Sequence, residues 1–468
     1  MRTTKLFLTL ITAATLSSCG IYKNYERPAE ISADGIYGDA QSGGEQGLGD
    51  IQWRQIFTDP TLQQLIEQAL AQNTSMRQAD LRIQEAQNNL KAAKLAFFPS
   101  LAFAPSGTIM GTVDPYNREK YENMMGNGAT KTYSFPISLN WQIDAFGTLR
   151  NTKKGREVAV ENMQSVRQAI QTALVANVAN LYYTLAMLDK QLAIAQETTE
   201  KWKKTVDMTK LLMEAGQANK AAVASTEANY WAICTSTIEL QNNIRQVENA
   251  LCSILGQTPG HISRNSIDTF QIPANLTTGL PIGLLSRRPD VHQAELALAS
   301  AFYNKNIAKA AFYPNITLSA NGQFANSISG AGIVNPGGFI FAAVASLTQP
   351  IFQNGRIRAA YKNSQAELDV ATIGFQQTLL DAGIEVNNAI AQLNSDNGKR
   401  QLLENQVKSY TDAVDANEKL YRQSNNNYLN VLTAQSGLLN AQMSQTTNTF
   451  NIIADVITLY QALGGGAE

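Results

Sequence analysis

Two histidines and three cysteines are the residues of this 468-residue chain best suited to metal binding or nucleophilic chemistry. His261 and His292 lie in different segments, and neither has a carboxylate or a cysteine at the spacing of a metal site. Cys234 and Cys252 are separated by about 27 Å along a predicted helix, so they cannot form a disulfide within one chain. The chain also has no phosphate-binding loop, nucleophile motif or dinucleotide fingerprint. The sequence therefore argues against an enzyme and implies neither a cofactor nor a metal site.

The third cysteine, Cys19, ends a processing signal. Arg2 and Lys5 precede an apolar run at residues 6–16 that is too short to span a bilayer. The string LSSC at residues 16–19 matches the bacterial lipobox, in which the cysteine becomes the lipidated first residue of the mature protein. The alternative is an ordinary secretory signal that ends near a cysteine. We expect lipidation, with palmitate, at Cys19, and Gly20 after it favours delivery to an outer membrane.

The charge of the chain is low and balanced. Charged residues make up 16% of the sequence and the formal net charge is -1. The chain therefore lacks the excess of basic residues that would indicate a nucleic-acid partner. Asn, Gln, Ser and Thr supply the polar surface instead, which suits a wall that faces water.

A helical seam dominates the segment from Thr148 to Ala215. Its apolar positions follow steps of four and three, which is the heptad pattern of helices that supercoil together. A buried core stripe is the alternative, but the run is longer than a single globular core. The seam consists of Leu174, Val178, Leu181, Leu185, Leu188, Leu192, Ala195, Thr199, Trp202, Val206, Thr209 and Met213.

Other stretches change to a period of two. From Thr132 to Ile143 apolar and aromatic residues alternate with polar ones, which is typical of a strand in a transmembrane barrel. Residues 100–112 are the expected partner, and residues 315–325 and 339–348 are the expected strands of the second half. Asp144 and Arg150 mark a strand-to-helix junction, where a helix cap is the simplest role.

The chain repeats itself. The string AFFPSL at residues 96–101 returns as AFYPNI at 311–316 with an offset of 215, and Gly147 and Arg150 match Gly355 and Arg358 with an offset of 208. Such offsets indicate tandem structural repeats. We predict a mainly α fold with a transmembrane β portion, each half holding a β-hairpin and long coiled-coil helices.

The predicted organisation divides the chain into ten segments. They are the lipoprotein signal peptide (1–18), a lipid-anchored extended segment (19–52), first-half helices (53–99), β-hairpin 1 (100–143), long helical hairpin 1 (144–256), a belt linker (257–288), a second-half helix (289–314), β-hairpin 2 (315–349), long helical hairpin 2 (350–463) and a tail (464–468).

Four strands cannot close a barrel, and open strand edges in hydrocarbon leave backbone groups unpaired at several kcal/mol each. The chain must therefore associate with further copies in a membrane. Two copies would give eight strands, whose interior side chains nearly fill the barrel, and three would give twelve, which leaves a pore.

The tandem halves, the string WQIDAFGTLR at residues 141–150 and its copy PIFQNGRIR at 350–358 resemble the TolC-like outer-membrane efflux proteins. The lipobox makes the chain similar to their lipoprotein branch, the NodT-type factors of tripartite efflux systems. This resemblance implies a homotrimer with a 12-stranded β-barrel in the outer membrane and an α-helical tunnel through the periplasm. It also implies two partners, a periplasmic adaptor (membrane-fusion) protein and an inner-membrane pump of the resistance-nodulation-division type.

The resemblance assigns the helix tips to adaptor docking, although a simple helix–helix turn is the alternative. The tip residues are Gly216, Gln217, Ala218, Asn219, Ser424, Asn425, Asn426 and Asn427. The expected gate residues are Tyr421, Leu429, Asn430 and Thr433. Several relatives have carboxylates where this chain has Asn430 and Thr433, so we expect a gate with weak ion selectivity. Alternatively, Asn430 only caps or packs the turn.

The function expected from this resemblance is a passive exit duct for small toxic compounds, drugs or metal ions, anchored in the outer membrane by lipid. An exit duct for a secreted protein and a non-conducting lipoprotein that tethers the two membranes are the alternatives. Neither the substrate nor the identity of the pump follows from the sequence.

Overall fold

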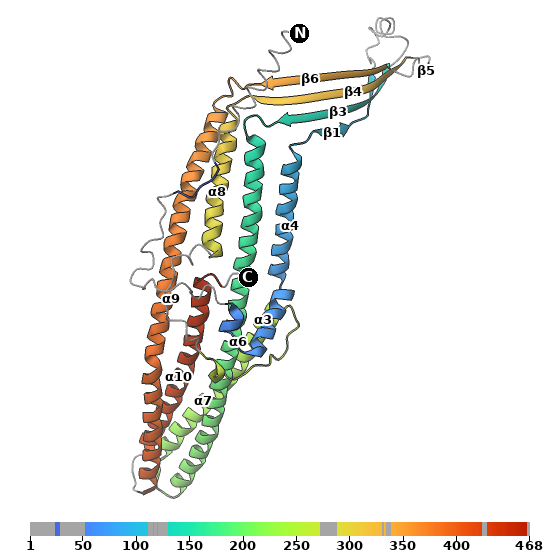
Figure 1. The fold of residues 1–468 in the computed structure, drawn as a ribbon. Coiled ribbons are helices and arrows are strands. Elements are labelled where there is room, and N and C mark those ends of the chain that lie inside the picture. Colours follow the sequence, from blue (N-terminus) through green and yellow to red (C-terminus); the bar gives the residue numbers. More distant parts are fainter. Residues whose placement is uncertain are drawn as a thin grey trace. The chain divides into compact units, whose positions relative to one another are not determined.

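The computed structural model describes residues 24–28, 52–110, 116, 119, 130–271, 288–329, 332–333, 338–423 and 428–465 (Figure 1). The expected lipidation site Cys19 and the second tip at residues 424–427 lie outside these ranges. The helices are α2 (Trp53–Ile56), α3 (Pro60–Gln72), α4 (Thr74–Leu95), α6 (Thr148–Glu214), α7 (Lys220–Ile254), α8 (Pro289–Ala310), α9 (Arg356–Gln423) and α10 (Tyr428–Ala462). The strands are β1 (Ser100–Phe103), β2 (Ser106–Met110), β3 (Thr130–Ile143), β4 (Asn315–Ser329), β5 (Gly332–Ile333) and β6 (Gly338–Thr348).

The strands form one antiparallel sheet. β3 and β4 pair along thirteen residues at its centre, from Ile143 with Ile316 to Lys131 with Ile328. β1 and β2 pair with the other side of β3, and β6 pairs with the other side of β4. The strand predicted at residues 132–143 is confirmed. The partner predicted at residues 100–112 is two short strands that keep one register with β3. The ladder is interrupted between Phe103 and Ser106, where Pro105 and Pro136 have no N–H to donate.

The helices confirm the internal repeat. α8 begins and ends 215 residues after α4, and α10 begins and ends 208 residues after α7. Gly147 and Gly355 each directly precede one of the two longest helices, α6 and α9. Both have φ 78°, a left-handed conformation that favours glycine. Gly256 and Gly464 form a second matched pair with positive φ, after α7 and α10. The two halves therefore share backbone detail as well as element order.

The residues just before α4 and α8 are hydrogen-bonded to the last residues of α7 and α10. The side-chain amide of Asn73, before α4, donates to the carbonyl of Ile254, the last residue of α7, at 3.0 Å. At the equivalent position before α8, Arg288 donates to the carbonyl of Ala462, the last residue of α10. These two bonds join the start of α4 to the end of α7 and the start of α8 to the end of α10.

The chain divides into two compact units. The first comprises residues 1–28, 83–162 and 295–373 and contains the sheet, and the second comprises residues 29–82, 163–294 and 374–468. Within the second unit the heptad seam is buried at Leu174, Val178, Leu185 and Trp202. None of the helices in the described ranges combines the length and apolar character that a membrane crossing would need.

Candidate functional site

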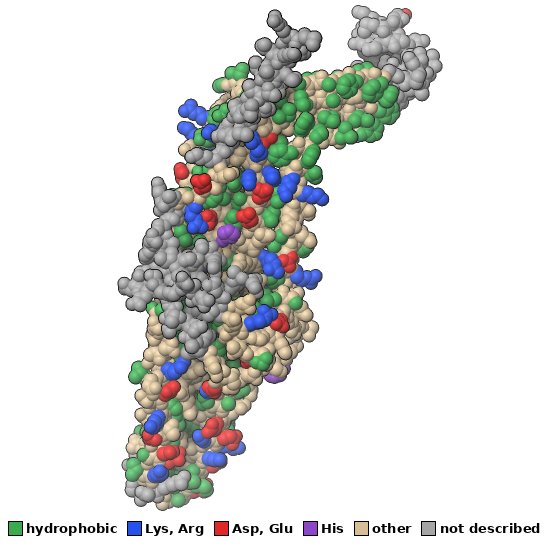
Figure 2. All heavy atoms as spheres, in the orientation of Figure 1, with side chains coloured by type: hydrophobic (Ala, Val, Ile, Leu, Met, Phe, Trp, Pro, Cys, Tyr) green, Lys and Arg blue, Asp and Glu red, His purple; other side chains and the backbone are tan. Residues whose placement is uncertain are grey.

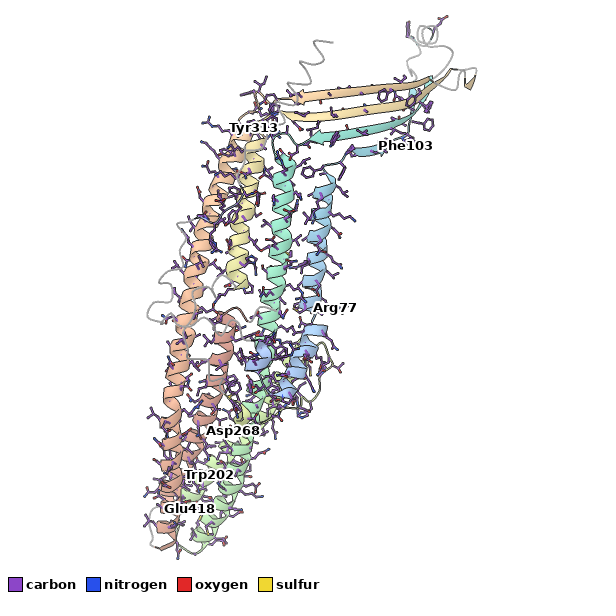
Figure 3. All side chains as sticks on the ribbon, in the orientation of Figure 1. Arg77, Phe103, Trp202, Asp268, Tyr313 and Glu418 are labelled. Atoms are coloured by element: carbon purple, nitrogen blue, oxygen red, sulfur yellow. The ribbon has the colours of Figure 1, made fainter. Side chains whose placement is uncertain are left out.

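The sheet presents an apolar face to solvent. Phe135 of β3 lies opposite Phe324 of β4, which lies opposite Phe339 of β6, and the last two rings have centroids 5.0 Å apart. Gly322 leaves room beside them, since a Cβ there would come within 2.9 Å of the Phe339 ring. This face also carries Leu101, Phe103, Ile137, Trp141, Phe341 and Leu347, all exposed (Figure 3). Such a surface needs a partner that is itself apolar.

The opposite face of the same strands is polar. Ser138 lies opposite Asn321, Asn140 opposite Ser319, and Gln142 opposite Thr317. The hydroxyl oxygens of Thr317 and Ser346 are 2.5 Å apart across β4 and β6. β6 departs from the pattern, because Ile340 and Val344 are exposed on the polar face. The face suits contact with water, and its strands contain one charged residue, Lys131, near the end remote from the helices.

The first helix tip is a closed turn. The carbonyl of Leu212 accepts bonds from the backbone N–H groups of Gln217, at 2.8 Å, and Ala218, at 3.1 Å. Gly216 has φ 70°. Asn219 caps α7 by accepting from the N–H of Ala222 at 2.8 Å. The turn satisfies its own backbone, so its exposed side chains are available to another molecule.

The four predicted gate residues lie in the described chain, on either side of the second tip. Leu429, Asn430 and Thr433 are exposed, whereas the intervening Val431 and Leu432 are buried against the bundle. The hydroxyl of Thr433 donates to the carbonyl of Leu429 at 2.9 Å, so it is bonded within its own helix. Asn430 and Thr433 therefore share the outward face of α10, and their roles as gate residues stay predictions.

Tyr421 at the end of α9 is partly buried, and burial raises the pKa of its hydroxyl. It keeps the proton at neutral pH and can donate a hydrogen bond. Its assignment to the gate also stays a prediction.

A hydrophobic cluster joins the two helical hairpins above their tips. Trp202 of α6 is 1% exposed and packs with Ile233 of α7 and Leu432 of α10 (Figure 3). Nearby, Lys210 and Glu227 form an ion pair at 2.8 Å between α6 and α7. Glu418 and Gln435, at the equivalent positions of the second half, form a hydrogen bond at 3.2 Å. The two hairpins thus share a core, and a matched polar bond joins the two helices within each hairpin.

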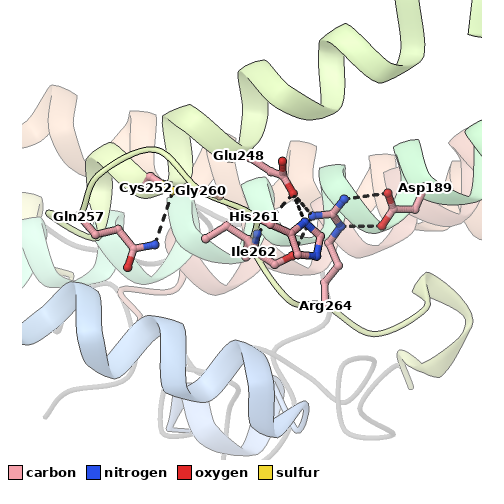
Figure 4. A network of polar contacts seen from close by, with 8 residues as sticks. All are labelled: Asp189, Glu248, Cys252, Gln257, Gly260, His261, Ile262 and Arg264. Atoms are coloured by element: carbon pink, nitrogen blue, oxygen red, sulfur yellow. Dashed lines mark hydrogen bonds and ion pairs between the residues drawn. The ribbon is translucent and has the colours of Figure 1, made fainter. Parts of the chain in front are cut away.

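A polar network that the sequence did not reveal surrounds Arg264 (Figure 4). Its guanidinium bonds to both carboxylate oxygens of Asp189, at 2.5 and 2.8 Å, and to Glu248 at 2.5 Å. Glu248 also lies 2.8 Å from Nδ1 of His261. Burial acts to raise the pKa of Glu248, but the bonds from Arg264 and Ile262 lower it. His261 lies in a loop that returns to α7, where its contact with Glu248 forms.

The other chemistry-bearing residues have structural contacts. His292, predicted on a helix surface, lies 2.7 Å from the hydroxyl of Ser165 and is half-buried. Cys252 is buried, as predicted, whereas Cys234 is only partly buried. Asp144 accepts from the backbone N–H groups of Leu149 and Arg150, each at 2.9 Å, which confirms its predicted cap. Among the described residues no cluster of His, Cys, Asp and Glu could hold a metal ion.

A pair of carboxyl groups lies between α9 and α10. Asp396 is 1% exposed and bonds to Lys399 at 2.6 Å and to Gln392 at 3.0 Å. Burial and the neighbouring charge of Asp396 raise the pKa of Asp455 to about 6. No pattern in the sequence marks this pair, because the heptad pattern predicts only which positions are apolar.

Comparisons with known proteins agree with this arrangement. The family model described as "Outer membrane efflux protein" matches residues 65–257 and 280–465. The chain is 29% identical to the toluene efflux pump outer membrane protein TtgC of Pseudomonas putida, over 99% of this chain and 96% of the relative. It is 27% identical to the cation efflux system protein CusC of Escherichia coli K12, over 97% of this chain and 98% of the relative. A crystal structure of CusC superposes with a TM-score of 0.82 at 25% identity and covers 96% of this chain and 100% of its own.

Proposed function

Because this chain belongs to the outer membrane efflux protein family, we propose that three copies of it form the outer-membrane exit duct of a tripartite efflux system. The duct is passive: an inner-membrane pump supplies the energy, and a periplasmic adaptor connects the pump to the helix tips. The N-terminal cysteine of the mature chain, Cys19, carries the lipid that anchors each copy to the outer membrane.

The observation that carries the proposal is the exposed sheet with its apolar face. In water this face would be strongly unfavourable, since burying apolar surface contributes about 25 cal/mol per Å². Phe135, Phe324 and Phe341 are all more than half exposed. Hydrocarbon chains of lipid satisfy these side chains, while the polar face turns to a water-filled interior.

The number of copies follows from the strand edges. Within the described chain, the outer side of β1 and β2 and the outer side of β6 have no strand paired to them. In a bilayer each unpaired backbone group costs several kcal/mol, so the edges must pair with those of other copies. Each copy supplies four rows of strand, with β1 and β2 sharing one row. Three copies give twelve rows, enough for a pore, whereas two give eight rows and a filled interior.

The cargo is a small toxic compound, a drug or a metal ion. The two relatives are named for toluene and for cations, which differ greatly in polarity. A duct that serves both kinds of cargo does not select by binding, and the uncharged polar face of the sheet agrees with that view. Selection belongs to the pump and the adaptor.

The proposal is tested by ionic current through the purified protein in a planar bilayer. Asn430→Cys places a thiol on the outward face of α10, and Asn430→Ser is the matched control without a reactive group. We expect a bulky thiol reagent added at the tip side to reduce the current of Asn430→Cys alone. Absence of any current from well-inserted protein, even after disruption of the tips, would favour a structural tether instead.

A further inference from the structure

A collar of basic residues surrounds the four helix ends next to the sheet. The fourteen-residue stretches 86–99, 144–157, 301–314 and 350–363 together contain eleven Lys and Arg and two acidic residues, although the whole chain carries a formal net charge of -1. All four stretches belong to the first compact unit, with the sheet. We call them the basic collar. In Figure 2 blue side chains gather on the helices beside the sheet, whereas the sheet surface itself is green and tan.

Direct contacts at the base of the sheet join the stretches to the ends of the strands and to one another. The indole N–H of Trp141 donates to the carbonyl of Phe97 at 2.9 Å. The amide of Gln349 donates to the carbonyl of Phe312 at 3.0 Å. Phe146 stacks on Tyr313 with ring centroids 5.2 Å apart. The collar is thus a built feature of one unit, adjacent to the ends of the strands.

The basic residues at the starts of α6 and α9 conflict with helix stability, unlike those at the ends of α4 and α8. α6 and α9 both begin at the sheet, and neither has an acidic residue in its first turn. A helix N-terminus carries partial positive charge, so basic side chains there are unfavourable by several tenths of a kcal/mol each. Arg356 and Arg358 stand in this position in α9 and are exposed. Local conflicts of this kind are expected where a residue serves a binding role.

The two halves differ in how they neutralise the collar. Arg150 lies 3.2 Å from the carboxylate of Asp144. Phe352 replaces that aspartate at the equivalent position of the second half, so Arg358 lacks the corresponding carboxylate. Phe352 is 83% exposed and its neighbour Ile351 is 96% exposed. Exposed apolar side chains next to exposed guanidinium groups match a membrane interface, where the ring enters the lipid and the charge meets the headgroup.

We propose that the basic collar binds anionic phospholipid headgroups in the leaflet that surrounds the helix side of the sheet. The inference rests on the proposed function, since it requires the sheet to lie in a bilayer. The one charged residue of the strands, Lys131, lies at the end remote from the helices, so lipid selection on the helix side arises at the collar. Each basic side chain near an anionic surface changes lipid affinity by up to about fivefold, and salt screens the effect.

The test uses the full-length protein in phosphatidylcholine vesicles that contain either spin-labelled phosphatidylglycerol or spin-labelled phosphatidylcholine. Electron spin resonance measures the fraction of each lipid immobilised by the protein. The variant Arg356→Gln/Arg358→Gln/Lys362→Gln removes three exposed charges from the collar. The matched control is Lys201→Gln/Lys203→Gln/Lys204→Gln, which removes three exposed charges from α6 outside the collar.

We expect the wild type and the control to immobilise phosphatidylglycerol preferentially, and the collar variant to lose at least half of that preference. Inorganic phosphate at matched ionic strength should not displace the lipid. Equal association of both lipids with the wild type, or an unchanged preference in the collar variant, would overturn the inference alone. Absence of immobilised lipid of either kind would refute the membrane location itself, and with it both proposals.

Discussion

The junction of α4 with α7 and the junction of α8 with α10 allow a quantitative prediction of stability. Arg288 is 6% exposed and bonds to Asp290 at 2.8 and 3.0 Å, to Glu385 at 2.6 Å, and to the carbonyl of Ala462. Its counterpart Asn73 makes one neutral bond across the other junction, to the carbonyl of Ile254, and also accepts from the N–H of Ser75 within α4. The substitution Arg288→Ala should therefore destabilise its junction more than Asn73→Ala destabilises the other.

The magnitude follows from how exposed the partners are. Removing one member of a buried ion pair usually costs about 3–5 kcal/mol, because the remaining charge stays desolvated. Here the side chains of Asp290 and Glu385 are 51% and 47% exposed, so water can solvate them in the variant. We therefore expect about 2–3 kcal/mol for Arg288→Ala, mainly from charge-assisted bonds, and about 1 kcal/mol for the neutral bond lost in Asn73→Ala.

Hydrogen exchange measured by mass spectrometry reads this loss locally. The amides of Leu463, Gly464 and Gly465 close the last turn of α10 through backbone bonds. In Arg288→Ala their exchange should accelerate by about 30- to 150-fold, which corresponds to the expected loss. The amides at the end of α7 should accelerate by about fivefold in Asn73→Ala. An acceleration below about threefold in Arg288→Ala, or a larger effect in Asn73→Ala, would refute the reasoning.

The same junction has a pH dependence with a defined sign. Burial acts to raise the pKa of Asp290, but the bond and the charge of Arg288 lower it overall. A lowered folded-state pKa gives stability that is present above the unfolded pKa, about 3.9, and is lost as the pH falls through the folded value. This acid-induced loss should be smaller in Arg288→Ala than in the wild type, as seen in thermal unfolding between pH 6 and pH 3.

Three further predictions concern the second helical hairpin and the tip. Gly437→Ala should lower the unfolding midpoint, with a cost of about 1–3 kcal/mol, because a Cβ there overlaps the ring of Tyr410; a neutral result would show that the ring moves freely. Asp455→Asn should raise thermal stability above pH 6 by about 1–2 kcal/mol and have little effect at pH 4. The pKa of Asp455 in the folded state is raised to about 6, so above pH 6 the folded protein carries an unfavourable charge beside Asp396. Equal effects at both pH values would contradict this. Asn430→Asp should increase cation preference in bilayer recordings, because three copies place three carboxylates at the tip, and unchanged reversal potentials would place residue 430 away from the conducting path.

Much of the fold follows from periodicity. The period of two at residues 132–143, the heptad seam at 174–213 and the repeat offsets predict β3, α6 and the second half within a few residues. The periodicities and the repeat offsets are patterns along the chain itself, so a single sequence is enough to detect them. The interruption between β1 and β2 was missed, although Pro105 and Pro136 stand there in the sequence, because their positions opposite each other's strand follow only from the pairing with β3.

Contacts between distant segments were harder to predict. The bond of Asn73 to the end of α7 and the network of Arg264 join residues more than seventy positions apart. Nothing in the spacing of Arg264, Asp189 and Glu248 marks them as neighbours, because a belt segment without periodicity positions the arginine. The tips were better predicted, since the positive φ of Gly216 and the cap at Asn219 depend on residues within one turn.

The central claim is that one chain supplies a third of a membrane-embedded wall. Light scattering combined with refractive-index and absorbance detection gives the protein mass of the detergent-solubilised particle, independent of bound detergent and lipid. The chain has a mass of 50.9 kDa before processing, so the account predicts a particle of three chains that requires detergent to remain in solution. A monodisperse single chain that stays soluble after detergent removal would contradict it.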